Sequence, residues 1–353
     1  MSLENMLGTL NLEMTAKVPR TEYSAHFHWD LVKSVTGIEV NADSPQSVKE
    51  NASREFVRKW DYGFMWGVCI YKEIFGEKRT SMGHAAYADG GKDFNTNTFK
   101  LFSDPEDVYD FDMFAEYGTP DVSKITEFCN AHFERQKRLY PSCLNMTGIY
   151  VTCISGLLEL MGWDTMLMAL GIDKTAFGKF VNRYCEWIQY YFEGLANCAS
   201  PVIMIHDDIV WGNGPFVSPE FYRTYVFPNY KKMFAPLIEA GKKVLYTSDG
   251  NFSMFVDDIA ACGVNGFVME PVTDMAYIAQ KYGKTHVFVG NADTGILLSG
   301  NPAAIENEVK RCMDIGKSCP GFVMAVGNHI PPNTPVENAL LYNEIYEKLA
   351  VRR

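Results

Sequence analysis

Acidic, imidazole and carboxamide side chains follow most of the apolar runs of this sequence. The densest group is His206-Asp207-Asp208, directly after the apolar run 202–205, and Thr247-Ser248-Asp249 follows the next short run in the same way. Carboxylates and imidazoles that reach a bound substrate can take a proton from it or return one. The pattern therefore predicts general acid–base chemistry at the ends of these runs.

The candidate residues fall into two groups. We expect a catalytic set made of Asp207, Asp249, Glu270 and His329. We expect a substrate-binding set made of His26, His28, His84, Tyr150, Asp208, Thr247, Asn291, Asp293 and Asn328. The acid that complements the carboxylates is expected to be His329 or His26.

A carboxylate after an apolar run also has a purely structural interpretation. Aspartate is a preferred N-cap, so each Asp alone could begin the next helix without touching a substrate. Charged groups gathered in one place are costly to bury unless they are paired. Because charged and polar residues follow so many of the apolar runs, a shared binding or catalytic site explains them better than a series of separate helix caps.

The elements that must position these residues alternate between strand and helix. Strand-like segments lie at 202–208, 243–248, 266–270, 286–291 and 321–327, and earlier ones at 22–28, 62–71 and 145–152. Helical patterns of ten or more residues follow the later strands. Eight strands with intervening helices predict a single (β/α)8 TIM barrel domain over residues 1–353, with the candidate residues at its mouth. An open doubly wound sheet is the alternative.

Residues 77–122 interrupt this alternation. Turn signals such as Asp89-Gly90-Gly91 and Asp104-Pro105 separate short strand-like pieces there. Long excursions of this kind are often lids. We therefore predict that this N-terminal excursion covers the barrel mouth and that His84 reaches the ligand from it.

Composition and charge exclude several classes of partner. The chain has 353 residues and a formal net charge of −11, so nucleic acid and anionic membranes are not expected to bind it. No apolar run approaches the length of a membrane span and no secretory leader is evident. The nine cysteines form no CxxC pair, as is typical of reduced thiols. These features predict a cytoplasmic protein.

Several motifs, in order along the chain, resemble the uroporphyrinogen decarboxylase family, which includes corrinoid-dependent methyltransferases. In the C-terminal half they are Asp207-Asp208, Gly212 to Ser218-Pro219-Glu220, Pro228 to Lys232, Gly241-Lys242-Lys243, Asp249-Gly250-Asn251, Gly263-Val264-Asn265-Gly266 with Glu270-Pro271, Gly290-Asn291-Ala292-Asp293, and Gly327-Asn328 with Pro332 to Asn338. The N-terminal half resembles the family through Trp60-Asp61-Tyr62, Phe64-Met65-Trp66 and Met82-Gly83-His84. The resemblance implies a (β/α)8 barrel.

The sequence departs from the decarboxylases of this family at two places. The resemblance implies an arginine-rich loop after the first strand, which holds propionate groups, and an aspartate at the second strand, which holds pyrrole nitrogens. Residues 23–29 contain no arginine, and Val68 or a neighbour stands where that aspartate would lie. These departures argue against decarboxylation of a porphyrinogen.

The sequence also departs from the methyltransferases of this family. The resemblance implies a zinc site formed by a His-x-Cys pair and a later cysteine, which presents a substrate thiol as thiolate. The matching positions are Thr247, Asp249 and Asn328. We therefore expect no metal site, no stoichiometric zinc and no tightly bound cofactor, with a methylcorrinoid as co-substrate and a corrinoid protein as a candidate partner.

Three functions remain open. The first is corrinoid-linked methyl transfer that uses the mouth carboxylates in place of a zinc thiolate. The second is decarboxylation of a porphyrinogen or a smaller carboxylic acid, and the third is a non-catalytic barrel that binds a corrinoid or another ligand. A small-molecule or tetrapyrrole substrate and a homodimer fit all three.

The first function makes a specific prediction about the site. We expect one pocket to be lined by Asp207, Asp249, Glu270, Asn328 and His329. Replacing Asp207 or Asp249 by asparagine is then expected to lower activity far more than stability, because asparagine caps a helix about as well as aspartate.

Overall fold

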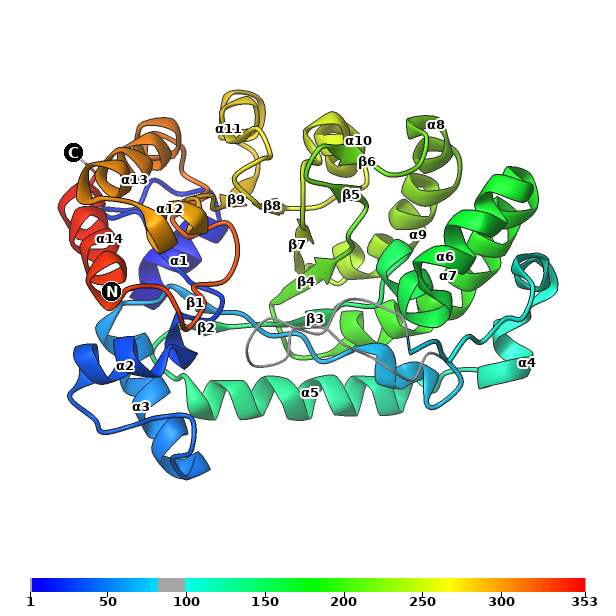
Figure 1. The fold of residues 1–353 in the computed structure, drawn as a ribbon, viewed down its shortest axis with the longest axis horizontal. Coiled ribbons are helices and arrows are strands. Elements are labelled where there is room, and N and C mark those ends of the chain that lie inside the picture. Colours follow the sequence, from blue (N-terminus) through cyan, green and yellow to red (C-terminus); the bar gives the residue numbers. More distant parts are fainter. Residues whose placement is uncertain (1, 82–98, 353) are drawn as a thin grey trace. The chain divides into compact units, whose positions relative to one another are not determined.

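The computed structural model describes residues 2–81 and 99–352, which form two compact units. The first unit comprises Met1–Gly67, His132–Met146 and Asn265–Arg353, and the second comprises Val68–Ala131 and Thr147–Val264. Figure 1 shows the helices and strands in chain order.

The second unit contains three neighbouring parallel strands, namely β3 (Thr147–Ile149), β4 (Val202–His206) and β7 (Lys243–Ser248). They lie side by side in Figure 1, with β4 between the other two. Ile149 is in register with Ile205, and His206 with Thr247. All five residues of β4 are buried, as expected for a parallel strand covered on both faces. The C-terminal ends of β4 and β7 therefore present their side chains next to each other.

Helices follow each of these strands. The sequence after β3 forms α6 (Ile154–Ile172), interrupted at Gly162 with φ 78°, and α7 (Lys174–Asn197), whose N-cap is Asp173. After β4, Ser218 and Pro219 begin α8 (Pro219–Phe221), which continues through the π-helix η4 (Tyr222–Val226) into α9 (Phe227–Glu239). After β7 come η5 (Ser253–Phe255) and α10 (Val256–Ala260). The predicted strand and helix alternation is confirmed here.

The remaining elements of the second unit are short. They are η2 (Lys72–Phe75), η3 (Pro105–Asp110), α4 (Met113–Tyr117), and the hairpin of β5 (Val210–Trp211) and β6 (Gly214–Pro215). The long helix α5 (Val122–Leu139) begins in this unit and ends in the first.

The predicted excursion 77–122 lies partly outside the described residues, as does His84. Its described part forms the short helices η3 and α4 where the sequence predicted short strands. Asp104 and Asp112 explain them, because each accepts a backbone N–H as an N-cap. Backbone and side-chain hydrogen bonds join Ser81 to Phe99. The position of the predicted excursion over a mouth stays a prediction.

The first unit contains the parallel strands β8 (Gly266–Met269), β9 (Val287–Val289) and β10 (Phe322–Val323), with β9 paired to both of the others. The strand pair β1 (Phe64–Met65) and β2 (Leu144–Asn145) is also parallel. The helices are α1 (Ser2–Leu10), η1 (Ala25–Phe27), α2 (Trp29–Thr36), α3 (Gln46–Lys59), α11 (Met275–Tyr282), α12 (Thr294–Ser299), α13 (Pro302–Gly316) and α14 (Val336–Leu349). Helices α13 and α14 pack together in Figure 1.

The prediction of a first core strand over 22–28 was wrong. This segment contains the 3-10 helix η1, and the strand contacts come earlier, where Arg20 bridges to Tyr62 and to Met324. Polar and apolar residues alternate over 22–28 for a reason other than strand formation. Glu22 is fully buried, where its carboxylate accepts hydrogen bonds from Arg20 at 2.7 Å and from the Tyr342 hydroxyl at 2.8 Å. A buried ion pair thus occupies the first position of the predicted strand.

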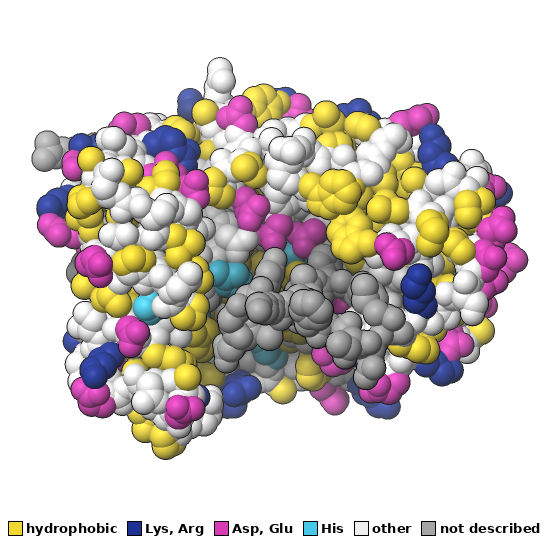
Figure 2. Space-filling model, in the orientation of Figure 1, with side chains coloured by type: hydrophobic (Ala, Val, Ile, Leu, Met, Phe, Trp, Pro, Cys, Tyr) yellow, Lys and Arg dark blue, Asp and Glu magenta, His cyan; other side chains and the backbone are white. Residues whose placement is uncertain are grey.

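Two further findings bear on partners. No helix among the described residues is long and apolar enough to cross a bilayer. On the face shown in Figure 2, acidic and basic side chains are interspersed among the coloured residues, and hydrophobic side chains gather beside acidic ones.

Candidate active site

The strand ends of the second unit bring four predicted site residues together with His206. We call Tyr150, His206, Asp208, Thr247 and Asp249 the strand-end cluster. His206 Nε2 lies 3.7 Å from Asp208 Oδ1, and the backbone N–H of Asp249 donates to the same Asp208 oxygen at 2.8 Å. A ring nitrogen of His206 and one carboxylate oxygen each of Asp208 and Asp249 all lie within 4.8 Å of one another. His206 is buried and Asp249 is exposed, so the cluster reaches from the interior to solvent.

Aromatic stacking fixes the interior side of the strand-end cluster. The Tyr150 and His206 rings stack with centroids 4.1 Å apart, and Tyr71 stacks on Tyr150 at 5.8 Å. Burial raises the pKa of the Tyr150 phenol, and the negative charges of Asp208 and Asp249 act in the same direction. Tyr150 therefore stays protonated at neutral pH and can donate a hydrogen bond.

Asp207 has a different environment from Asp208, although the two are adjacent. Its side chain is fully buried, and its oxygens accept hydrogen bonds from the backbone N–H groups of Cys153, Ile154 and Ser155 at 3.1, 3.1 and 2.6 Å. The Tyr230 hydroxyl donates to it at 2.5 Å. Burial raises the pKa of the Asp207 carboxyl, and these hydrogen bonds oppose that rise. We therefore assign Asp207 to capping the N-terminus of α6, in place of the predicted catalytic role.

An aromatic hairpin lies beside the loop that holds Asp249. Asn251 donates its backbone N–H to the carbonyl of Trp211 at 3.0 Å. A Cβ on Gly250, whose φ is 81°, would lie 2.7 Å from the Trp211 backbone, so only glycine allows this approach. Trp163 contacts Trp211 and Phe216, with ring centroids 5.7 and 4.9 Å away. The side chain of Trp211 is about half exposed, which leaves an accessible aromatic surface next to Asp249.

A second group of predicted residues gathers in the first unit. The Asn328 amide donates to Glu270 Oε1 at 2.6 Å, and the backbone N–H of His329 donates to Asn328 Oδ1 at 2.8 Å. The Tyr23 ring lies 5.8 Å from the ring of His329 and stacks on Trp66 at 4.3 Å. Glu270, Asn328 and His329 thus form one contact group, as predicted for neighbouring strand ends. That they share a pocket with Asp249 stays a prediction.

Three predicted binding residues have structural partners in the first unit. His28 Nδ1 accepts the Leu31 N–H at 3.2 Å and so caps α2. Asp293 caps α12. Asn291 is fully buried, where its amide donates to the carbonyls of Glu270 and Thr273 and its side-chain oxygen accepts from Arg311. These contacts account for all three side chains without a substrate.

His26 is enclosed by aromatic rings. Its ring centroid lies 4.0 Å from that of Phe27 and 5.8 Å from that of Tyr140, and its Nδ1 has no hydrogen-bond partner among the described residues. Burial lowers the pKa of the His26 imidazole from 6.5 to about 3, and His329 acts in the same direction. His26 is therefore neutral at pH 7, and of the two predicted acids we retain His329.

This low pKa predicts how stability depends on pH. The His26 imidazole is neutral in the folded protein, whereas in the unfolded chain it takes up a proton near pH 6.5. Its contribution to the free energy of unfolding is therefore complete above pH 6.5 and is lost as the pH falls from 6.5 towards 3. Between pH 7.5 and 5.5 the loss is on the order of 1 kcal/mol of unfolding free energy. Urea unfolding of the wild type and His26→Gln across this range measures it. Equal pH slopes in the two proteins would contradict the assignment.

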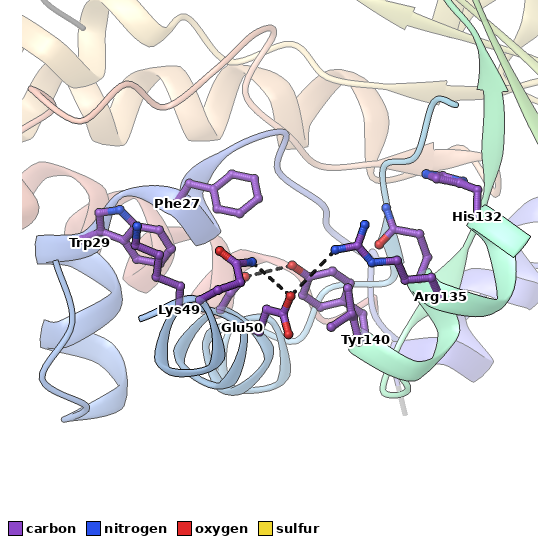
Figure 3. A pocket seen from close by; sticks show the side chains of 11 residues that line it. Phe27, Trp29, Lys49, Glu50, His132, Arg135 and Tyr140 are labelled. Carbon is purple, nitrogen blue, oxygen red and sulfur yellow. Dashed lines mark hydrogen bonds and ion pairs between the residues drawn. The ribbon is translucent and has the colours of Figure 1, made fainter. Parts of the chain in front are cut away.

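The first unit also contains a pocket of about 230 Å³ between α3 and α5. Figure 3 shows Phe27 and Trp29 at one side of it, and Arg135 directed toward Glu50. The Glu50 carboxylate lies 3.8 Å from Arg135 and accepts a hydrogen bond from Gln46 at 3.0 Å. The described residues that line this pocket include none of the predicted site residues. We therefore place the candidate chemistry at the strand ends and not in this pocket.

The zinc site implied by the resemblance does not fit the residues present. Thr247, Asp249 and Asn328 offer a hydroxyl, a carboxylate and a carboxamide in place of an imidazole and two thiolates. The Asn328 amide is already bonded to Glu270. All nine cysteines are buried, and none belongs to the strand-end cluster. These positions therefore do not provide the thiolate donors of that site.

Sequence reasoning missed two features of the candidate site. The aromatic hairpin of β5 and β6 was not predicted, although Trp211, shortly after the predicted strand 202–208, was a signal for a ligand contact. The grouping of His206, Asp208 and Asp249 was also missed, although the spacing His-x-Asp at the end of a strand suggested two side chains on one face.

A family model described as uroporphyrinogen decarboxylase matches residues 108–348. The uroporphyrinogen decarboxylase of Pelobacter propionicus is 26% identical over 160 residues, which are 45% of this chain and 45% of that protein. That of Thermus thermophilus is 24% identical over 178 residues, half of each protein. The chain thus spans about half the length of the curated relatives it matches.

Similarity to a solved structure covers more of the chain. A methyltransferase from Methanosarcina mazei matches with a TM-score of 0.64 and 16% identity, over 98% of this chain and 98% of that one. Together with the family match, this likeness confirms the predicted fold class, a (β/α)8 barrel. That residues 1–353 form one domain stays a prediction.

Proposed function

The chain belongs to the uroporphyrinogen decarboxylase family, and we propose that within this family it is a methyltransferase that moves a methyl group between a corrinoid and an oxygen or nitrogen atom of a small substrate. One observation carries the proposal. The strand-end cluster combines two carboxylates, an imidazole and a phenol beside an accessible aromatic surface. This set is suited to proton transfer at a heteroatom.

The charge of the strand-end cluster favours this reaction over porphyrinogen decarboxylation. A porphyrinogen bears several carboxylates, and Asp208 and Asp249 would repel them. Residues 23–29 have no arginine to offset this repulsion. Arg20, which precedes this segment in the sequence, is fully buried in its ion pair with Glu22. Its guanidinium lies over the Trp60 ring, 4.4 Å from the ring centroid. The arginine that stands closest in sequence to the expected propionate loop therefore has a structural role.

Asp249 is the general base of the proposed reaction. When an O–H or N–H group accepts the methyl, a new O–C or N–C bond forms, and the carboxylate of Asp249 takes the displaced proton. In the reverse direction the same group returns the proton to the leaving heteroatom. A bound corrinoid would supply the centre that exchanges the methyl group. Asp249 suits this role because its side chain is exposed while its backbone is held by Asp208.

The neighbouring groups orient the heteroatom. Tyr150 stays protonated because burial raises its pKa, so its hydroxyl can donate a hydrogen bond to the heteroatom. The aromatic hairpin supplies a flat apolar surface next to Asp249, on which a planar ligand can stack. The methyltransferase from Methanosarcina mazei, which matches nearly the whole chain, also supports this reaction class.

Decarboxylation is the second candidate, because the curated relatives that match half of the chain are uroporphyrinogen decarboxylases. A smaller carboxylic acid would need fewer positive charges than a porphyrinogen. This candidate predicts loss of carbon dioxide without a corrinoid.

A direct experiment separates the two candidates. The purified chain is mixed with reduced cobalamin and a panel of methyl ethers, methylamines and methyl thioethers, and absorbance follows methylation of the corrinoid. A second reaction contains uroporphyrinogen, and chromatography counts the carboxylates of the product. We expect methyl transfer with an ether or an amine and no change in the porphyrinogen. A porphyrinogen product, or activity with thioethers alone, would refute the proposal.

A further inference from the structure

We propose that His206, Asp208 and Asp249 hold a single divalent transition-metal cation in the second unit. Their ligand atoms, one imidazole nitrogen and two carboxylate oxygens, lie within 4.8 Å of one another. A site of this composition differs from the cysteine-based site that the resemblance implies, and it replaces our expectation of no metal. The inference goes beyond the proposed reaction, because cation binding is measured without turnover. Asp249 offers one carboxylate oxygen to the ion and keeps the other to take the proton.

The geometry requires only a small adjustment. Ligands about 2.1 Å from a common ion lie roughly 3 to 3.5 Å apart. His206 Nε2 and Asp208 Oδ1 are already 3.7 Å apart. Asp249 is exposed, so a change of its side-chain rotamer displaces no core residue. The backbone N–H of Asp249 fixes Asp208 Oδ1 at 2.8 Å, which is the type of outer contact that orients metal ligands.

A second observation points to a ligand at the same place. Thr247 is 4% exposed, and its hydroxyl has no hydrogen-bond partner among the described residues. Thr247 is in register with His206 on the neighbouring parallel strand, so the two side chains lie on the same face of the sheet. An orphaned buried hydroxyl is costly, and a bound ion or its water would satisfy it.

The donor set selects the class of ion. Imidazole nitrogen suits zinc, iron and nickel, while carboxylate oxygen suits manganese and magnesium. A mixed set of one nitrogen and two oxygens therefore fits Zn²⁺ or Mn²⁺. Three protein ligands leave coordination positions for water or an oxygen of a substrate, which the ion would polarise.

Metal titration tests the site. The full-length protein is stripped with EDTA, desalted and titrated calorimetrically with MnCl₂ and, separately, ZnCl₂. We expect one ion per chain, at least tenfold weaker binding in Asp249→Asn, and unchanged binding in Asp173→Asn. Asp173 is a matched control because it is an exposed helix cap in the same unit, where asparagine serves equally well.

Thr247→Val adds a test that a general loss of folding would not mimic. Without metal, its melting temperature should equal or exceed that of the wild type, because an unpaired buried hydroxyl is removed. The rise in melting temperature on adding Mn²⁺ should be smaller than in the wild type. Absence of saturable binding of both ions, or equal affinity in the wild type and folded Asp249→Asn, would overturn the proposal. In that case methyl transfer can still be tested by the corrinoid assay, so the two failures are distinguishable.

Discussion

Asp249→Asn is expected to lower turnover by a factor of about 10² to 10⁴, the usual contribution of a positioned general base. Asparagine preserves the size of the side chain but cannot take a proton at neutral pH, and it is a weaker ligand for a cation. The side chain is exposed, so the free energy of unfolding should change by less than about 0.5 kcal/mol. Corrinoid methylation rates and urea unfolding of the same preparation measure the two effects.

The control for Asp249 is Asp173→Asn, which also removes one negative charge from the second unit. Asp173 accepts the backbone N–H groups of Thr175 and Ala176, both at 2.9 Å, at the start of α7. Asparagine makes the same bonds, so neither turnover nor stability should change. If Asp249→Asn retained the turnover of this control, the carboxylate mechanism would have to be abandoned.

Asp207→Ala is expected to lower the free energy of unfolding far more than turnover, which is the reverse of Asp249→Asn. The substitution leaves three backbone N–H groups of α6 and the Tyr230 hydroxyl without their buried acceptor. Each buried donor left without an acceptor costs about 1 to 3 kcal/mol, so the loss of stability should amount to several kcal/mol. Asp207→Asn should cost less, because one acceptor oxygen remains. Chemical denaturation of both variants gives the free energies.

Tyr230→Phe is a milder change to the same hydrogen-bond network and serves as a comparison for the Asp207 variants. It removes one of the four donors to Asp207, together with the 3.4 Å hydrogen bond between the Tyr230 and Tyr246 hydroxyls, so it should cost about 1 kcal/mol. Turnover of the protein that remains folded should be close to normal in all three variants, because Asp207 is fully buried. An Asp207→Ala protein with wild-type stability but without activity would restore the catalytic role that the sequence suggested.

The contrast between Asp207 and Asp208 shows where sequence reasoning ended. Both follow the same strand, and the side-chain period of two sends adjacent residues to opposite faces. From the sequence alone, either could be a cap or a catalytic group. Only the packing of α6 against the end of β4 decided that Asp207 accepts the helix N–H groups while Asp208 contacts Asp249.

The regular part of the fold followed from local patterns. Short apolar runs predicted β4, β7 and β8. These features depend on residues close together in the chain, so the sequence determines them directly. The family resemblance rests on the same segments.

The first segment shows the limit of such patterns. The alternation over 22–28 is compatible with a half-buried strand, but Glu22 is buried because Arg20, Tyr342 and the Val326 N–H satisfy it. Two of these partners lie about 300 residues away in the sequence. The sequence by itself thus determined the elements and the kinds of side chain at their ends. The tertiary structure decided which carboxylates are satisfied by backbone donors and which remain at the site, because burial and hydrogen bonding depend on residues distant in the chain.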